Sequence, residues 1–272
     1  MTVEVARPVM RYFGGKWRLA DWVIAHFPPH LVYTEAFGGA ASVLLRKERA
    51  KVEVYNDLDD EIVNVFRVLR SPQKWPELQR RMHMMPFARA EFERREEPSD
   101  DIDRALWTLF LSRAGFGANA IFGQATSMRI RRDARSTPAH EWAALWPYVE
   151  RWAARFSRVM VESGPAASVL ARYDSPSALH YVDPPYVHAT RGKRNRYRCE
   201  MTDQDHRNLV AVLRGLRGMV VLSGYQCDLY QDMLGDWQRI NRPHFADGAR
   251  DRVESLWLSP SAAAARDPRL IA

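Results

Sequence analysis

The stretch Ala178-Leu-His-Tyr-Val-Asp-Pro-Pro-Tyr186 decides the fold that we predict for this chain. Apolar residues, interrupted by one histidine, run up to a carboxylate and then stop at two prolines and an aromatic ring. This is the pattern of a buried strand that ends in a rigid loop. In open α/β sheets, ligands bind beyond the carboxyl ends of the strands. The stretch therefore predicts a central strand that delivers Asp183-Pro-Pro-Tyr186 to a binding edge.

The chemistry of this loop is that of a hydrogen-bond acceptor. Pro184 and Pro185 lack N–H groups and have fixed φ angles, so they leave carbonyl groups on a stiff frame beside the Asp183 carboxylate. The Tyr186 ring offers a face on which a planar base can stack. Acceptors on both hydrogens of an exocyclic amino group would direct its lone pair at an electrophile. We therefore expect these four residues to be catalytic in alkylating an amine, with a purely structural turn as the alternative.

Strands and helices alternate in the amino-terminal part of the chain. The segments 31–37 and 51–55 have the character of strands, and 40–49 and 58–69 that of helices. This order predicts an α/β fold with a parallel sheet and helices on its faces. Further strands are expected at residues 158–162, 179–182, 218–223, 237–241 and 253–258. Further helices are expected at residues 86–95, 102–113, 141–156, 202–216 and 228–234, with a capping box at the start of the fourth.

Two glycine pairs lie beside the expected binding edge. Gly14-Gly15 precedes an amphipathic run, so bare N–H groups at a helix start, together with Lys16, suit an anion. Gly38-Gly39 is followed about twenty residues later by Asp57, the spacing at which an acidic residue meets ribose hydroxyl groups. The full pyrophosphate fingerprint is absent and Glu35 precedes the turn, which favours a positively charged, nucleoside-type cofactor. An ordinary glycine turn and an acidic residue at a strand end are the alternatives.

The pattern changes between residues 71 and 156, where strand signals vanish and helical stretches rich in Trp and Arg follow. A glycine-rich aromatic loop at 115–123 is followed by a basic run at 129–135, and a second basic loop lies at 190–198. Arg side chains suit phosphates and guanine edges, and an aromatic ring can wedge between bases. The alternative is a hydrophobic core with a solvated Arg face. The expected DNA contacts are Arg113, Phe116, Asn119, Phe122, Arg129, Arg131, Arg132, Arg194 and Arg196.

The composition is that of a globular protein with a polyanionic partner. The chain has 272 residues, 46% of them hydrophobic and 27% charged, which is enough to bury a sizeable core. Its 40 Lys and Arg residues, most of them Arg, give a net charge of +7, although an Arg-rich genome would have the same effect. The two cysteines lack metal-ligand spacing and a disulfide framework, so we expect no metal site and a cytoplasmic location. No apolar run is long enough to span a membrane, so we expect no membrane partner.

Six motifs in this order resemble the Dam-like (D12 class) DNA adenine N6-methyltransferases: Tyr12-Phe-Gly-Gly-Lys16, Glu35-Ala-Phe-Gly-Gly39, Asn56-Asp57, Asp183-Pro-Pro-Tyr186, Thr202-Asp-Gln-Asp-His206 and Ser223-Gly-Tyr225. The resemblance covers nearly the whole chain. It implies a Rossmann-like sheet that binds S-adenosylmethionine, with residues 1–70 and 157–260 as a catalytic domain. Residues 71–156 would then be an inserted helical target-recognition domain. We expect residues 261–272 to form a flexible tail.

The resemblance also implies roles for single residues. A flipped adenine would bond through its amino nitrogen to Asp183 and the Pro184 carbonyl, stack on Tyr186 and accept the methyl group at N6. The loop at 115–122 lacks the Asn-Gly pair and the Arg that many relatives carry, so GATC specificity is not implied. The expected cofactor contacts, with Glu35 added from its place before the turn, are Tyr12, Lys16, Glu35, Phe37, Gly38, Gly39, Asp57 and Asp183.

Other functions stay open at this point. Cytosine N4 and an RNA adenine present a similar exocyclic amine, so an acceptor loop of this kind does not separate them from a DNA adenine. A non-catalytic DNA-binding protein on a methyltransferase scaffold is a further alternative, although it would not need Lys16, Asp57 or Asp183.

The family resemblance also implies partners. The expected partner is double-stranded DNA in a bacterial or phage-infected cell, and a cognate restriction endonuclease is a second potential partner.

Overall fold

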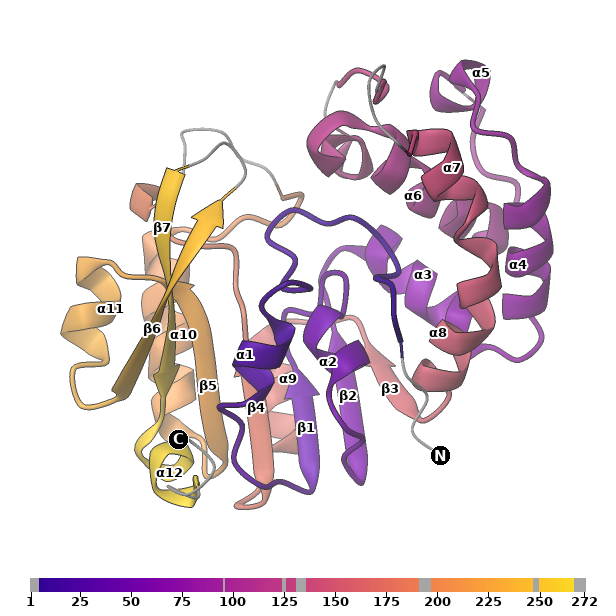
Figure 1. Ribbon diagram of the computed structural model, residues 1–272. Helices are drawn as coiled ribbons and strands as arrows, with labels where there is room; N and C mark the ends of the chain where they lie inside the picture. Colours follow the sequence, from indigo (N-terminus) through magenta and orange to yellow (C-terminus); the bar gives the residue numbers. More distant parts are fainter. Residues whose placement is uncertain are drawn as a thin grey trace.

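The protein is built on one sheet of seven strands in the order β3-β2-β1-β4-β5-β7-β6, as shown by a computed structural model (Figure 1). The structure describes residues 5–94, 96–123, 126–130, 136–190, 197–246 and 250–266, without the side chains of 118–119, 244–246 and 250–252. The strands are β1 (Val32–Glu35), β2 (Val52–Asn56), β3 (Val159–Glu162), β4 (Ala178–Val182), β5 (Met219–Tyr225), β6 (Gln238–Ala246) and β7 (Arg250–Leu258). Strands β3, β2, β1, β4 and β5 are parallel, whereas β7 and β6 are antiparallel to their neighbours. The predicted α/β fold is confirmed.

Strand β4 lies between β1 and β5, and all five of its residues are buried. Leu179 and Tyr181 belong to one hydrophobic core, and Val182 belongs to another on the opposite face. A strand that is buried on both faces has a continuous apolar sequence, which explains the run that precedes Asp183. Glu35 at the end of β1 pairs with Tyr181, so the parallel strands end at the same edge of the sheet.

Helices cover both faces of the sheet (Figure 1). Helices α1 and α2 contribute to the core on one face, and α9, α10 and α11 contribute to the core on the other. The capping box predicted for α10 is confirmed, because the side chains of Thr202 and Asp205 each accept the backbone N–H of the other. The bounds are α1 (Ala20–Ile24), α2 (Ser42–Arg46), α9 (Ala166–Tyr173), α10 (Asp203–Gly215) and α11 (Asp228–Met233).

A group of helices lies between β2 and β3 in the sequence and beside the β3 edge of the sheet in space (Figure 1). The described residues of this segment contain no strand, only an isolated bridge between Gly115 and Met128. A buried ion pair ties the group to the sheet, since Arg155 Nη1 lies 2.6 Å from Glu53 Oε2 on β2. The helices are α3 (Asp60–Arg70), α4 (Trp75–Met84), α5 (Arg89–Phe92), α6 (Asp101–Ala114), α7 (Pro138–Ala143) and α8 (Val149–Phe156).

Three of these helices differ from prediction. The helix expected at residues 141–156 is divided into α7 and α8 by a 3-10 turn at Trp146–Tyr148, which contains Pro147. Proline has no N–H to continue the helical hydrogen bonds. Helix α4 was not predicted, and Pro76 lies in its first turn, where a missing N–H is tolerated. The helix expected at residues 86–95 is reduced to the single turn of α5.

The prediction of a flexible tail from residue 261 onward is wrong for the part that the structure describes. Helix α12 (Pro260–Ala265) contacts β5, and Ala262 within it is fully buried. The Ser259 hydroxyl caps this helix by accepting the Ala262 N–H at 3.2 Å, and it also accepts the Val220 N–H at 3.0 Å. An alanine-rich segment shows little periodicity, yet its small side chains allow close packing. Residues 267–272 lie outside the described residues.

Glu35 connects the end of β1 to α2. Its side chain is buried, and its Oε2 accepts hydrogen bonds from the Tyr33 hydroxyl at 2.8 Å and from the Leu44 N–H at 2.9 Å. Burial raises the pKa of Glu35 to about 8, although both hydrogen bonds act in the opposite direction. The folded protein therefore holds a proton on Glu35 at pH values where the unfolded chain has lost it.

This coupling predicts a stability difference for Glu35→Gln. Because the folded-state pKa is raised, the stabilisation from protonated Glu35 is complete below pH 4.5 and is lost as the pH rises to about 8. The amide keeps an acceptor oxygen without titrating. We expect the variant to gain stability relative to the wild type across this window, by at most about 1.4 kcal/mol per pH unit. Urea unfolding at several pH values measures the difference, with the exposed Glu48→Gln as control. Parallel pH profiles for the wild type and Glu35→Gln would contradict the prediction.

Candidate active site

Lys16 and Asp183 meet at the carboxyl edge of the sheet. Lys16 Nζ lies 2.9 Å from Asp183 Oδ1 and donates a hydrogen bond to the Gly14 carbonyl at 3.0 Å. Burial raises the pKa of Asp183 to about 6, the nearby Lys16 charge lowers it, and the Glu254 charge raises it further. Burial lowers the pKa of Lys16, but the charges of Asp183 and Glu254 outweigh this effect and raise it. The pair is therefore a carboxylate and an ammonium group near neutral pH.

The Tyr186 ring forms the next part of this wall. Lys16 Nζ lies over the ring, 4.7 Å from its centroid, and the Tyr225 ring packs edge-on at a centroid distance of 4.6 Å. The Tyr186 hydroxyl donates to Glu254 Oε1. Burial raises the pKa of Tyr186 well above its ordinary value, so the hydroxyl remains protonated. The structure thus brings Asp183, Pro184, Pro185 and Tyr186 to one side of a common cavity.

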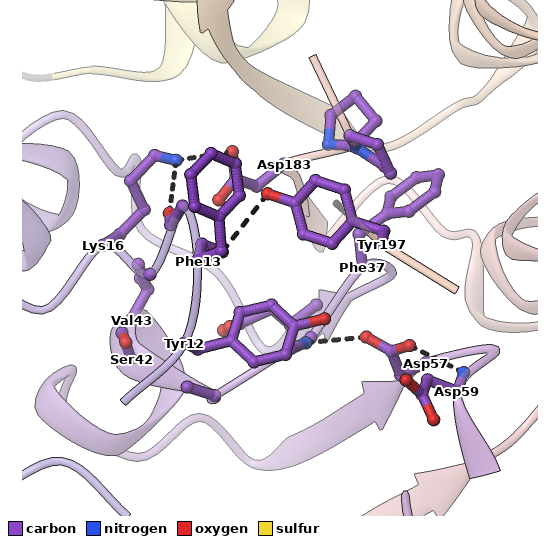
Figure 2. A pocket seen from close by; sticks show the side chains of 18 of the residues that line it. Tyr12, Phe13, Lys16, Phe37, Ser42, Val43, Asp57, Asp59, Asp183 and Tyr197 are labelled. Atoms are coloured by element: carbon purple, nitrogen blue, oxygen red, sulfur yellow. Dashed lines mark hydrogen bonds and ion pairs between the residues drawn. The ribbon is translucent and has the colours of Figure 1, made fainter. Parts of the chain in front are cut away.

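This cavity has a volume of about 590 Å³ and lies at the ends of β1, β2 and β4 (Figure 2). All eight side chains or glycines that we expected to contact a cofactor line it. Figure 2 shows Asp57 on one side of the Tyr12 ring and the Lys16–Asp183 pair on the other. The strand ends therefore enclose one site from segments that are distant in the sequence.

The glycine pair after β1 shapes the floor of the cavity. Gly39 has a φ of +45°, and a Cβ atom on it would lie 2.7 Å from the Tyr12 ring. A Cβ atom on Gly38 would collide with the Tyr55 ring. The Gly39 N–H donates to Asp57 Oδ2 at 2.8 Å, so the acidic residue after β2 holds the turn after β1. Burial raises the pKa of Asp57, and hydrogen bonds from Asp59 and Gly39 oppose this.

Sequence reasoning missed two acidic residues that line the cavity. Glu254 lies on β7, where its Oε1 accepts from the Ser223 hydroxyl at 3.0 Å. The alternation of β7 carried a signal, because Glu254 shares the buried face of Leu256 and a charge on such a face is unusual. Asp59 accepts from Arg198 Nη1 at 2.8 Å and caps α3. Its place two residues after Asp57 was the available signal.

Tyr197 closes one side of the cavity and connects three segments. Its hydroxyl donates to the Phe13 carbonyl at 3.2 Å. Its ring centroid lies 6.1 Å from that of Tyr12 and 5.6 Å from that of Phe122. Phe122 belongs to the 3-10 segment Phe116–Phe122, so these rings join the helical group to the cavity wall.

The structure corrects three of the expected DNA contacts. Arg113 is 8% exposed and donates to the Pro8 carbonyl at 2.7 Å. Phe122 is 7% exposed and packs against Tyr12, so it is a core residue. Arg129 pairs with Glu141 at 3.0 Å within the helical group. Arg129 Nη1 also donates to the Arg113 carbonyl in the last turn of α6 at 2.9 Å, so each of these side chains has partners within the protein. Phe116, in contrast, is 66% exposed. The Asn119 side chain and residues Arg131, Arg132, Arg194 and Arg196 lie outside the described part.

Two cysteines add thiol groups to the part of the chain that the structure describes. Cys199 and Cys227 are free thiols, and Cys199 lines the cavity. Within that part of the chain, no group of three or more His, Cys, Asp or Glu side chains is arranged to hold a metal ion. Over the same residues, every helix is too short or too polar to cross a membrane.

Comparison with known proteins places this site in a family. The chain matches the model of the D12 class N6 adenine-specific DNA methyltransferases over residues 12–245. It is 25% identical over 187 residues to the DNA adenine methylases of Salmonella typhi, Escherichia coli (strain K12) and Vibrio cholerae. The aligned segment spans 66% of this chain and 65% of each relative, just under two thirds of their length. The family match contains every residue of the cavity wall described above except Glu254, and the chain belongs to the D12 class N6 adenine-specific DNA methyltransferase family.

Proposed function

We propose that this protein transfers a methyl group from S-adenosylmethionine to N6 of an adenine in duplex DNA. The observation that carries the proposal is the meeting of two elements at one sheet edge. The rigid acceptor loop Asp183–Tyr186 lines the same cavity as the glycine turn and Asp57. A base amine bound by the first element and a nucleoside bound by the second would lie next to each other. Membership of the D12 class supplies the reaction type.

The residues of the cavity fit S-adenosylmethionine. Glycines are required at positions 38 and 39, because a Cβ atom on either would meet an aromatic ring. The Tyr55 and Tyr12 rings therefore pack directly against this turn, whose backbone lines the cavity. Tyr12 offers a ring for stacking, and Asp57 offers carboxylate oxygens for ribose hydroxyl groups. The acidic lining suits a ligand with a sulfonium and an ammonium group. When bound, the cofactor supplies an electrophilic methyl group.

Asp183 and the Pro184 carbonyl would accept the hydrogens of the adenine amino group. The pKa of about 6 leaves Asp183 ionised at neutral pH, and Lys16 favours this state. The target nitrogen gains a methyl group and loses one proton, for which Asp183 is the adjacent acceptor. Lys16 covers one face of the Tyr186 ring, 4.7 Å from the centroid, and a base that stacks on this face would displace it.

The helical segment 71–156 is the proposed target-recognition region, and residues 1–70 with 157–260 form the proposed catalytic unit. Phe116 is the exposed aromatic side chain of this region and the remaining candidate for a wedge between bases. Asn119, Arg131, Arg132, Arg194 and Arg196 stay predictions for DNA contact. A cytoplasmic location and a restriction endonuclease as partner stay predictions as well.

The proposal is tested by incubating the protein with methyl-labelled S-adenosylmethionine and unmethylated duplex DNA. We expect label in N6-methyladenine after digestion to nucleosides. Asp183→Ala removes the acceptor of the amine and should lower the rate by roughly 10²- to 10⁴-fold. Circular dichroism and thermal unfolding would show that the variant is folded. Label in N4-methylcytosine would replace the proposed base. Full activity of Asp183→Ala would contradict the proposed mechanism.

Phe116 and Phe122 give a matched pair for the DNA surface. Phe116→Ala removes an exposed ring, so we expect unchanged thermal stability but roughly tenfold weaker base extrusion, because stacking contributes about 1–3 kcal/mol per base. Phe122→Ala removes a buried ring and should destabilise the fold by about 3 kcal/mol. The readouts are thermal unfolding and the fluorescence of 2-aminopurine at the mapped target position. Normal base extrusion by Phe116→Ala would remove Phe116 from the proposed surface.

A further inference from the structure

Glu254 places a second buried carboxyl group beside the acceptor loop. Its side chain is 3% exposed, and its Oε1 accepts from both the Tyr186 hydroxyl and the Ser223 hydroxyl. The same oxygen lies 3.9 Å from Lys16 Nζ. The pairing of β7 with β5 sets this position, because Glu254 stands opposite Tyr225 at the carboxyl end of β5. One carboxyl group therefore accepts hydrogen bonds from Tyr186 and Ser223 and lies close to Lys16.

A buried acid at this place needs an explanation beyond packing. Burial of a carboxylate is costly unless it is paired and hydrogen-bonded. Its neighbours on the same strand, Ser255 and Leu256, are fully buried, so an apolar residue at position 254 would fit the core more easily. The partners of Glu254 are those side chains that an incoming base must displace or contact. This points to a role in the site.

Lys16 lies between two carboxyl groups at unequal distances. It contacts Asp183 at 2.9 Å and lies 3.9 Å from Glu254. An adenine that places its amino group on Asp183 Oδ1 and its ring on the face of Tyr186 that Lys16 covers would compete with the ammonium group for both. The lysine side chain is long and flexible, so a small rotation can exchange one carboxyl partner for the other.

We infer that Glu254 is a positioning residue for the proposed methyl transfer: it holds the Tyr186 ring through its hydroxyl and receives Lys16 when the target amine takes its place at Asp183. The inference rests on the proposed function. Glu254 acts through Tyr186 and Lys16. Without its charge, Lys16 stays on Asp183 and blocks the acceptor, and the Tyr186 ring loses its anchor.

The titration of Asp183 reports on this arrangement. Six titratable groups face Asp183 from the elements around it. The charged or acidic ones are Lys16 from the loop before α1, Glu254 from β7 and Glu35 from β1. The phenols are Tyr181 from β4, Tyr186 from the acceptor loop and Tyr230 from α11. Of these, Lys16 lowers the pKa of Asp183 and Glu254 raises it. Neutralising Glu254 removes a raising influence, so the pKa of Asp183 must fall. The acid limb of any rate that needs ionised Asp183 then moves to lower pH.

Glu254→Gln tests the inference because it keeps the size and an acceptor oxygen and removes the charge. Carbon-13 NMR of labelled Asp carboxyl groups, with Asp183 assigned by its loss in Asp183→Asn, should show a lower titration midpoint in the variant. Single-turnover methylation at neutral pH should be slower by roughly 10- to 100-fold, because this is the rate change that corresponds to the free energy of a hydrogen bond to a charged group. Its acid limb should move in the same direction as the NMR midpoint. An unchanged midpoint, or an unchanged rate, would overturn the inference.

Two further variants separate positioning from loss of structure. Asp174→Asn is a matched change of a largely buried acid far from the cavity, where it accepts the Gly218 N–H at 2.8 Å. It should lower thermal stability and leave the titration midpoint of Asp183 unchanged.

Tyr186→Phe removes only the hydroxyl that donates to Glu254. It should slow methylation without adding to the effect of Glu254→Gln. Additive effects of the two substitutions would contradict the role of Glu254 in holding the Tyr186 ring. Full activity of Tyr186→Phe would contradict it as well, and this test does not depend on whether Glu254→Gln folds. If the wild type labels no DNA, the proposed function fails, while the NMR comparison still decides whether Glu254 controls Asp183.

Discussion

The buried ion pair between Lys16 and Asp183 is the interaction on which the site depends. Its two residues come from distant segments, and the 2.9 Å contact fixes the loop before α1 against the end of β4. Two charges removed from water are stable only with good geometry and additional partners. Here the Gly14 carbonyl and the Tyr186 ring serve the ammonium group. The same contact favours the ionised form of Asp183, and in the proposed function it involves the carboxylate that would accept the base amine.

The cavity is also connected to the helical group beside the sheet. Tyr197 contacts Phe13 and packs near Tyr12 and Phe122, so one ring cluster spans the cavity wall and the 3-10 segment after α6. At the opposite end of the helical group, the buried Arg155–Glu53 pair fixes α8 to β2. Breaking one partner of a buried pair is strongly destabilising. The helical group is therefore held to the rest of the protein at two places.

Much of the fold was predictable because parallel strands buried on both faces have unmistakable apolar runs, and β4 is the best case. The residues that line the cavity were predictable because strand ends of a parallel sheet converge. Contacts set by tertiary packing were not. Arg113 and Phe122 have the composition of a DNA surface, yet they fill the interior. Glu254 was missed because only the pairing of β7 with β5 brings it to the acceptor loop, and α12 because alanines give no periodic signal.

The most direct measurement is a crystal structure of the protein with S-adenosylhomocysteine and a duplex that carries the mapped target site. The account predicts that the ligand lies in the cavity lined by Tyr12, Gly38 and Asp57. It also predicts that the target adenine lies outside the helix, with its amino group within hydrogen-bonding distance of Asp183. A ligand bound elsewhere, or an extruded base whose amino group makes no contact with Asp183, would contradict the account.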